Sequence, residues 1–220
     1  MDINLLSGVG HSVFLVVAYA LIGSGMKYVD QAFDFGVFSK KSAIIMTIPG
    51  AILVGMLMAI NDSSATIFFA IILGVALTKK IDNIAFQMSL FFLMLVPIFL
   101  SEYVKVEWLP FVLLFMAGVA DEYTSDWADS KIKQRIYDTT RDIKRKITLK
   151  QQILEMLFEH RIIMKLVILL LIVFRVFHPI YLIAFLAFDL SYTAVELYSF
   201  QLKKYNINRD LKANHKTTTV

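Results

Sequence analysis

The sequence contains no cysteine, only four histidines and few charged residues. Asp, Glu, Lys and Arg together make up 18% of its 220 residues, whereas an average soluble domain has about 25%. The absence of Cys excludes disulfides, thiolate metal sites and thiol catalysis. Four scattered His residues without any Cys also argue against a zinc site.

Several signatures of nucleotide-binding and hydrolytic enzymes are missing as well. The sequence has no G-x-x-x-x-G-K-[ST], G-x-G-x-x-G, H-E-x-x-H or G-x-S-x-G pattern. The long basic stretch is not interleaved with aromatic residues, so we expect no nucleic-acid partner. The first residues lack the basic region and cleavage site of a secretory signal peptide, so we expect the first apolar run to be retained.

Apolar side chains are what the sequence has in excess. Hydrophobic residues make up 58% of the chain, with a mean hydropathy of +0.66. One soluble core of this size cannot bury so much apolar surface, and seven runs approach the roughly 20 residues of a membrane-spanning helix. The sequence predicts an all-α, polytopic transmembrane bundle that forms a single integral membrane domain, 1–220. The expected spans are Leu5–Met26, Ala43–Ile60, Ser63–Thr78, Ile84–Leu100, Val104–Ala120, Ile162–Phe177 and Ile180–Leu197.

The positive charges orient this bundle. If the N-terminus is outside, only Lys105 and Arg175 of the 22 basic residues fall towards the outer side. Because cytoplasmic loops carry the excess of Lys and Arg, we expect a cytoplasmic C-terminus with a basic tail at about 201–220. The short loops favour the cell (plasma) membrane. An even number of spans would break the alternation of charge.

The only long polar stretch between spans is 130–160. Four isoleucines in it recur at helical intervals, and Thr148 with Gln151 resembles a capping box that opens a second helix, Thr148–Glu159. We predict a cytoplasmic helical hairpin that packs on the bundle. The alternative is an amphipathic helix that lies on anionic lipid. The isoleucines are Ile132, Ile136, Ile143 and Ile147.

Acidic residues gather on the predicted cytoplasmic side. If the fifth helix continues past Ala120, then Glu122, Asp126 and Asp129 lie at i, i+4 and i+7 and share one face. Carboxylates at this spacing repel one another, and Mg²⁺ offsets that repulsion while it usually binds a phosphate too. The alternative is a solvated helix end balanced by nearby basic residues. The predicted metal ligands are Asp82, Asp121, Glu122, Asp126 and Asp129.

Basic residues flank this acidic set and suggest a phosphate ligand. With Lys79, Lys80 or Lys131 on the phosphate and Asp126 as a catalytic group, the sequence predicts a Mg²⁺-dependent enzyme that acts on a lipid or isoprenoid phosphate. Segment 121–129 lacks the Asn-x-x-x-Asp-x-x-x-Asp spacing of intramembrane prenyltransferases and the Gly and Arg framework of CDP-alcohol phosphotransferases. The sequence therefore assigns neither family.

The seventh apolar run carries a second group of polar residues. Asp189 lies near its middle, and Tyr192 and Glu196 follow at i+3 and i+7. A carboxylate in hydrocarbon costs roughly 2.5–3.5 kcal/mol on insertion scales, so Asp189 should face the bundle interior, pair with another group or be protonated. Lys165 is the expected partner of Glu196, and such pairs could simply fix the packing of the helices. Asp189 and Glu196 would close the inner end of an enzyme cavity, or act as coupling groups of an ion- or proton-coupled transporter or channel. A third alternative is a non-catalytic membrane scaffold whose carboxylates are individually dispensable.

Overall fold

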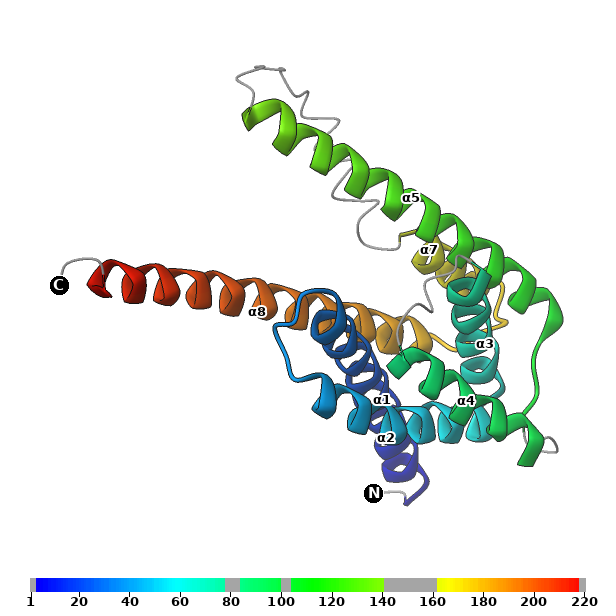
Figure 1. Cartoon of the computed structure of the whole chain (residues 1–220). Coiled ribbons are helices and arrows are strands. Elements are labelled where there is room, and N and C mark those ends of the chain that lie inside the picture. The colour runs from blue at the N-terminus through cyan, green and yellow to red at the C-terminus, as the bar shows by residue number, and fades with distance from the viewer. Residues whose placement is uncertain (1–2, 78–83, 100–103, 141–161, 218–220) are drawn as a thin grey trace. The chain divides into compact units, whose positions relative to one another are not determined.

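The computed structural model describes residues 3–77, 84–99, 104–140 and 162–217. In these ranges the chain forms seven α-helices and no β-strand (Figure 1). The prediction of an all-α fold is confirmed. The helices are α1 (Ile3–Asp34), α2 (Lys40–Ile60), α3 (Asp62–Leu77), α4 (Ile84–Phe99), α5 (Trp108–Thr140), α7 (Ile162–Val173) and α8 (Ile180–Thr217).

Each predicted apolar run lies on one of these helices. The bounds of α2, α3 and α4 agree with the predicted runs to within three residues. Three helical segments are long and apolar enough to cross a membrane, namely Gly8–Asp34, Lys40–Ile60 and Ile180–Lys203, while Asp62–Leu77, Ile84–Leu93 and Ile162–Val173 are apolar but shorter. The protein is therefore a helical, membrane-associated chain.

Three helices continue well beyond the apolar runs that predicted them. α1 ends at Asp34 rather than Met26, so Asp30 and Asp34, which lie beyond the predicted span, are helical. α5 continues to Thr140 and so includes the first part of the predicted insert. α8 continues to Thr217, so most of the predicted tail is helical. The second predicted insert helix, Thr148–Glu159, lies outside the described residues.

The chain divides into two compact units, and the boundaries between them fall within α2, α4 and α8 and between α3 and α4. The first unit comprises 1–55, 83–96 and 183–220, and the second comprises 56–82 and 97–182. α1 and most of α8 therefore belong to the first unit, and α3, α5 and α7 to the second.

In the first unit, α1 and α8 pack together in parallel. The Ser191 hydroxyl donates a hydrogen bond to the main-chain oxygen of Ala20 at 2.6 Å, and further along both helices Ser199 donates to Gln31 at 2.8 Å. The side-chain hydrogen bonds between the two helices join residues 162 to 171 positions apart. Because this separation stays nearly constant, both helices run in the same direction.

In the second unit, α5 packs against α3 and α7 (Figure 1). At one end of this packing the Thr66 hydroxyl accepts a hydrogen bond from the Glu107 main-chain N–H at 3.0 Å and donates to the Asp62 main-chain oxygen at 2.8 Å. The Tyr181 side chain hydrogen-bonds with Ser63 and Ser64. These contacts join the start of α3 to the segment before α5 and to the start of α8.

Both units expose rows of large apolar side chains. On α1 an exposed row recurs every fourth residue, at Val9, Val13, Val17 and Leu21. α5 and α7 expose similar rows, which include Leu109, Val112, Met116, Leu166, Leu170 and Val173. Contiguous apolar patches of this kind are typical of surfaces that contact a membrane or another protein. They agree with the membrane association indicated by the helix lengths.

Candidate functional sites

Asp121 lies at the point where α5 meets the beginning of α7. Its side chain is only 2% exposed. One carboxylate oxygen accepts the main-chain N–H of Ile163 at 2.9 Å, and the other accepts that of Met164 at 2.8 Å. The first N–H groups of a helix have no partner within the helix, and an anion is favoured there. Asp121 therefore caps the N-terminus of α7, a role that the sequence did not predict.

Glu122 is buried beside Asp121, with only 6% of its surface exposed. The two acidic residues line a cavity of about 10 Å³ between α3, α5 and α7. This volume is close to what one water molecule needs. The other lining residues are Ile71, Gly74, Val75, Gly118 and Met164. Two of these are glycines, and a Cβ atom built on Gly74 would lie 3.9 Å from the main chain of Gly118.

The remaining acidic residues of the predicted metal site follow Glu122 along the same helix. Because α5 is unbroken from Trp108 to Thr140, Glu122, Asp126 and Asp129 do occupy positions i, i+4 and i+7 of one helix. The side chains of Asp126, Asp129 and Lys131 are outside the described part of the structure, as are Lys79, Lys80 and Asp82 altogether.

No group of three His, Asp or Glu side chains that could hold a metal ion occurs among the described side chains. Because most of the predicted Mg²⁺ ligands lie outside that part of the chain, the metal site stays a prediction. What the described residues show is a pair of adjacent, buried carboxylates where three helices meet.

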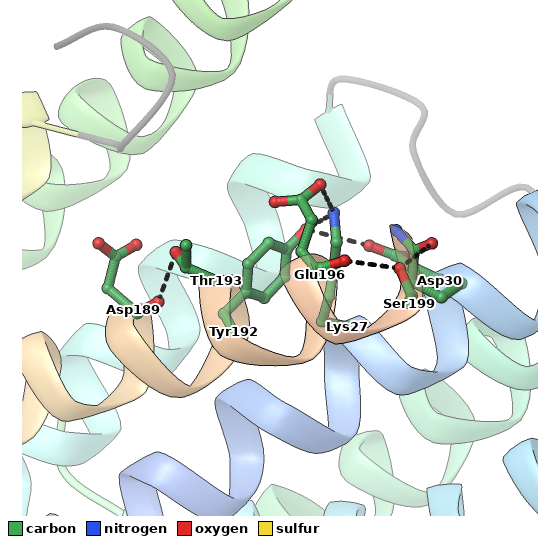
Figure 2. Close-up of polar contacts among 8 residues, drawn as sticks. Lys27, Asp30, Asp189, Tyr192, Thr193, Glu196 and Ser199 are labelled. Atoms are coloured by element: carbon green, nitrogen blue, oxygen red, sulfur yellow. Dashed lines mark hydrogen bonds and ion pairs between the residues drawn. The ribbon is translucent and has the colours of Figure 1, made fainter. Parts of the chain in front are cut away.

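A second cluster of charged residues lies between α1 and α8 in the first unit (Figure 2). The Lys27 ammonium forms an ion pair with Glu196 at 2.6 Å. It also donates a hydrogen bond to the Tyr192 hydroxyl at 3.4 Å and lies 4.6 Å from the centre of the Tyr192 ring. The Tyr192 hydroxyl in turn donates to the Asp30 carboxylate at 3.1 Å. A continuous chain of polar contacts thus runs from Glu196 through Lys27 and Tyr192 to Asp30.

The lysine of this cluster is buried. Lys27 is only 9% exposed although lysine is among the residues least often buried. One turn further on, the buried Ser199 hydroxyl donates to the side-chain oxygen of buried Gln31 at 2.8 Å, and also contacts the Glu196 main-chain oxygen at 2.7 Å. The polar groups therefore satisfy one another across the helix pair.

Of the two acidic residues predicted on this helix, only Glu196 joins the cluster. Figure 2 shows the carboxylate of Asp189 apart from Lys27, and the Asp189 main-chain oxygen accepts a hydrogen bond from Thr193 at 3.0 Å. The partner of Glu196 is Lys27 rather than the expected Lys165, which belongs to the other unit. Sequence reasoning missed Lys27 and Asp30 because it placed both beyond the end of the first helix.

Comparisons with protein-family models, with curated proteins and with solved structures find no match.

Proposed function

We propose that the chain is a multi-pass protein of the cell membrane with seven spans, an external N-terminus and a cytoplasmic C-terminus. Every predicted apolar run lies on a helix. The parallel packing of α1 and α8 supports an odd number of spans, because a first and a last span that run in the same direction need an odd number of spans between them. In the described ranges five helices, α2, α3, α4, α5 and α7, lie between them in the sequence.

Within this membrane protein we propose a Mg²⁺-dependent enzyme site for a lipid or isoprenoid phosphate at the cytoplasmic face. The observation that carries the proposal is the burial of Asp121 and Glu122 in one cavity where α3, α5 and α7 meet. α3 ends at Leu77, three residues after Gly74 in the cavity lining, so Lys79, Lys80 and Asp82 follow directly in the sequence. α7 begins at the same cavity, where Asp121 caps its first main-chain N–H groups.

The helix geometry of α5 limits how its carboxylates can share a metal ion. With a rise of about 1.5 Å per residue, Glu122 and Asp129 are about 10 Å apart along the helix. Mg²⁺ binds its ligands at about 2.1 Å, so a single ion can contact only neighbouring members of the row. We propose that Asp126 holds the ion with either Glu122 or Asp129, and that Asp82 completes the set.

Each remaining residue then has a distinct part. Asp121 fixes α7 beside the site through its two main-chain hydrogen bonds. Lys79, Lys80 and Lys131 would contact the phosphate, and Mg²⁺, when bound, would neutralise part of the phosphate charge. Asp189 and Glu196 belong to the first unit, so the proposal rests on the second unit alone.

The substitution Asp126→Asn tests the enzyme proposal. We expect it to weaken Mg²⁺ binding to the purified full chain by at least about tenfold, since loss of even an indirect support of a metal site costs about 10–100-fold. Isothermal titration in detergent measures the binding. The matched control is Asp34→Asn, which changes an exposed carboxylate at the end of α1. This variant should bind Mg²⁺ as the wild type does. Unchanged Mg²⁺ binding in Asp126→Asn would rule out the proposed metal site.

The cluster between α1 and α8 supports a second candidate function, ion- or proton-coupled transport. Lys27, Asp30, Tyr192 and Glu196 all lie within candidate membrane spans, where ionisable residues commonly mark ion or proton pathways. The chain of contacts from Glu196 to Asp30 would supply sites for a transported proton or cation. Under this proposal Glu196 is the coupling residue and Asp189 a neighbouring carboxylate on the same helix.

Flux measurements on vesicles that contain the purified chain test this second candidate. Glu196→Gln should lower proton or cation flux at least about tenfold, because the variant keeps the side-chain shape but loses the charge that pairs with Lys27. The control Glu107→Gln changes a carboxylate of the other unit and should leave the flux unchanged. Equal flux in both variants would exclude transport through the cluster. If Asp126→Asn also left Mg²⁺ binding unchanged, a non-catalytic membrane scaffold would be the remaining alternative.

A further inference from the structure

α8 is much longer than a membrane span requires. Its candidate span is Ile180–Lys203, whereas the helix continues without a break to Thr217 (Figure 1). At about 1.5 Å per residue, the span covers about 36 Å and the extension adds about 21 Å. The hydrocarbon core of a bilayer is only about 30 Å thick. If α8 crosses the bilayer, the part of the helix that follows Lys203 therefore lies beyond the hydrocarbon.

The extension is strongly basic. From position 203 to the C-terminus the sequence has five Lys or Arg residues and one acidic residue, Asp210. A cluster of four to eight Lys and Arg directly beyond a spanning helix is typical of segments that bind anionic lipid. The basic residues are Lys203, Lys204, Arg209, Lys212 and Lys216, and the last three recur at intervals of three and four residues.

An exposed aromatic surface lies where the extension begins. Phe35 after α1, and Tyr198 and Phe200 on α8, are 47%, 56% and 49% exposed. The rings of Phe35 and Phe200 pack edge to face, with their centres 6.4 Å apart. The Lys203 ammonium lies 4.7 Å from the centre of the Phe35 ring. Aromatic rings beside lysines are characteristic of the zone between the hydrocarbon and the headgroups.

A second lysine extends the same surface to α2. The Lys40 ammonium lies 5.4 Å from the centre of the Phe33 ring. The Phe38 ring stacks on those of Tyr28 and Tyr198, with distances of 4.4 and 6.5 Å between ring centres. The end of α1, the end of the α8 candidate span and the start of α2 thus present aromatic rings and ammonium groups together. We call this surface the aromatic–lysine surface. Its charged residues are Lys40 and Lys203, and its rings are those of Phe33, Phe35, Phe38, Tyr198 and Phe200.

We propose that the aromatic–lysine surface and the basic extension of α8 bind the headgroups of anionic phospholipids in the adjacent leaflet. A phospholipid supplies both a phosphate for the ammonium groups and glycerol and acyl carbons for the exposed rings. Free phosphate would leave the rings in water. A second copy of the chain would bring two basic extensions together, and like charges repel. This proposal does not depend on the metal site of the second unit.

Lipid binding to the purified full chain in neutral detergent, followed by native mass spectrometry, tests the proposal. Phosphatidylglycerol should bind more tightly than phosphatidylcholine, and added salt should reduce the difference because it screens the charges. Lys203→Gln should lower the affinity for phosphatidylglycerol roughly fivefold, the effect expected for one basic residue near an anionic surface. Lys105→Gln, an exposed lysine of the other unit, is the matched control and should have no effect.

Three results would overturn the proposal. The first is equal affinity of the wild type for the two lipids. The second is competition by inorganic phosphate at the concentration at which phosphatidylglycerol binds, which would point to a site for a free anion. The third is a Lys203→Gln variant with unchanged lipid affinity but an altered oligomeric state, which would assign the surface to contact between copies.

Discussion

At the scale of single residues, Lys27 and Gly23 show what holds α1 against α8. Lys27 contacts the carboxylate of Glu196 and both the hydroxyl and the ring of Tyr192. One turn earlier, Gly23 lets the two backbones approach so closely that a Cβ atom there would overlap the Phe188 main-chain oxygen and lie 2.8 Å from the Ser191 hydroxyl. The close approach at Gly23 and the ion pair at Lys27 therefore fix the same helix pair at successive turns.

Gly23→Ala should destabilise this pair. The added methyl group meets main-chain atoms, which cannot move aside as a flexible side chain can, so we expect a loss of about 1–3 kcal/mol in the free energy of unfolding. Gly25→Ala is a control in the same helix, because a Cβ atom there has no neighbour within 4 Å. That change should be neutral or stabilise the helix by up to about 1 kcal/mol. Unfolding of both variants in mixed detergent measures the difference, and equal stabilities would contradict the close packing at Gly23.

At the scale of helices, the sequence predicted where the apolar cores lie but not where the helices end. Hydropathy reports contact with lipid, so it located Ile84–Phe99 almost to the residue. It cannot report the end of α1, where polar residues such as Lys27 and Gln31 continue the helix. The chain turns only at Gly36, whose positive φ of 63° glycine adopts at little cost. The extension of α8 was missed for the same reason, whereas the sequence analysis had allowed for the continuation of α5 past Ala120.

Among these helices α7 depends most on a residue from elsewhere in the chain. It has only 12 residues, and isolated helices of about that length are marginal. Asp121→Ala would leave two main-chain N–H groups without their acceptor, so we expect a loss of about 1–3 kcal/mol in the free energy of unfolding. Hydrogen exchange at Ile163 and Met164 should become faster, whereas the control Asp34→Ala should leave it unchanged. Unaltered exchange in Asp121→Ala would mean that α7 does not need this cap.

At the scale of the whole molecule, the two candidate sites differ in how much of each was predictable. The row of Glu122, Asp126 and Asp129 follows from the repeat of one helix, which depends only on local sequence. The partner of Glu196 is Lys27, 169 residues earlier in the chain, and no local pattern encodes such a contact. The cap from Asp121 to α7 is likewise a contact over more than 40 residues. Function that depends on such contacts could not be predicted from periodicity and composition.

The direction in which each helix crosses the membrane is testable because the chain has no Cys. A single Cys introduced at an exposed lysine then reports one position without background.

Since α1 and α8 run in parallel, Lys40→Cys after α1 and Lys203→Cys at the end of the α8 span must lie on the same side if both helices cross. Lys105→Cys is separated from Lys40 by α2, α3 and α4, so three crossings place it on the opposite side. A membrane-impermeant maleimide should label Lys105→Cys in intact cells, and the other two variants only after permeabilisation. Labelling of Lys40→Cys and Lys203→Cys from opposite sides would exclude an odd number of spans, and labelling of all three from one side would mean that α2, α3 and α4 do not all cross.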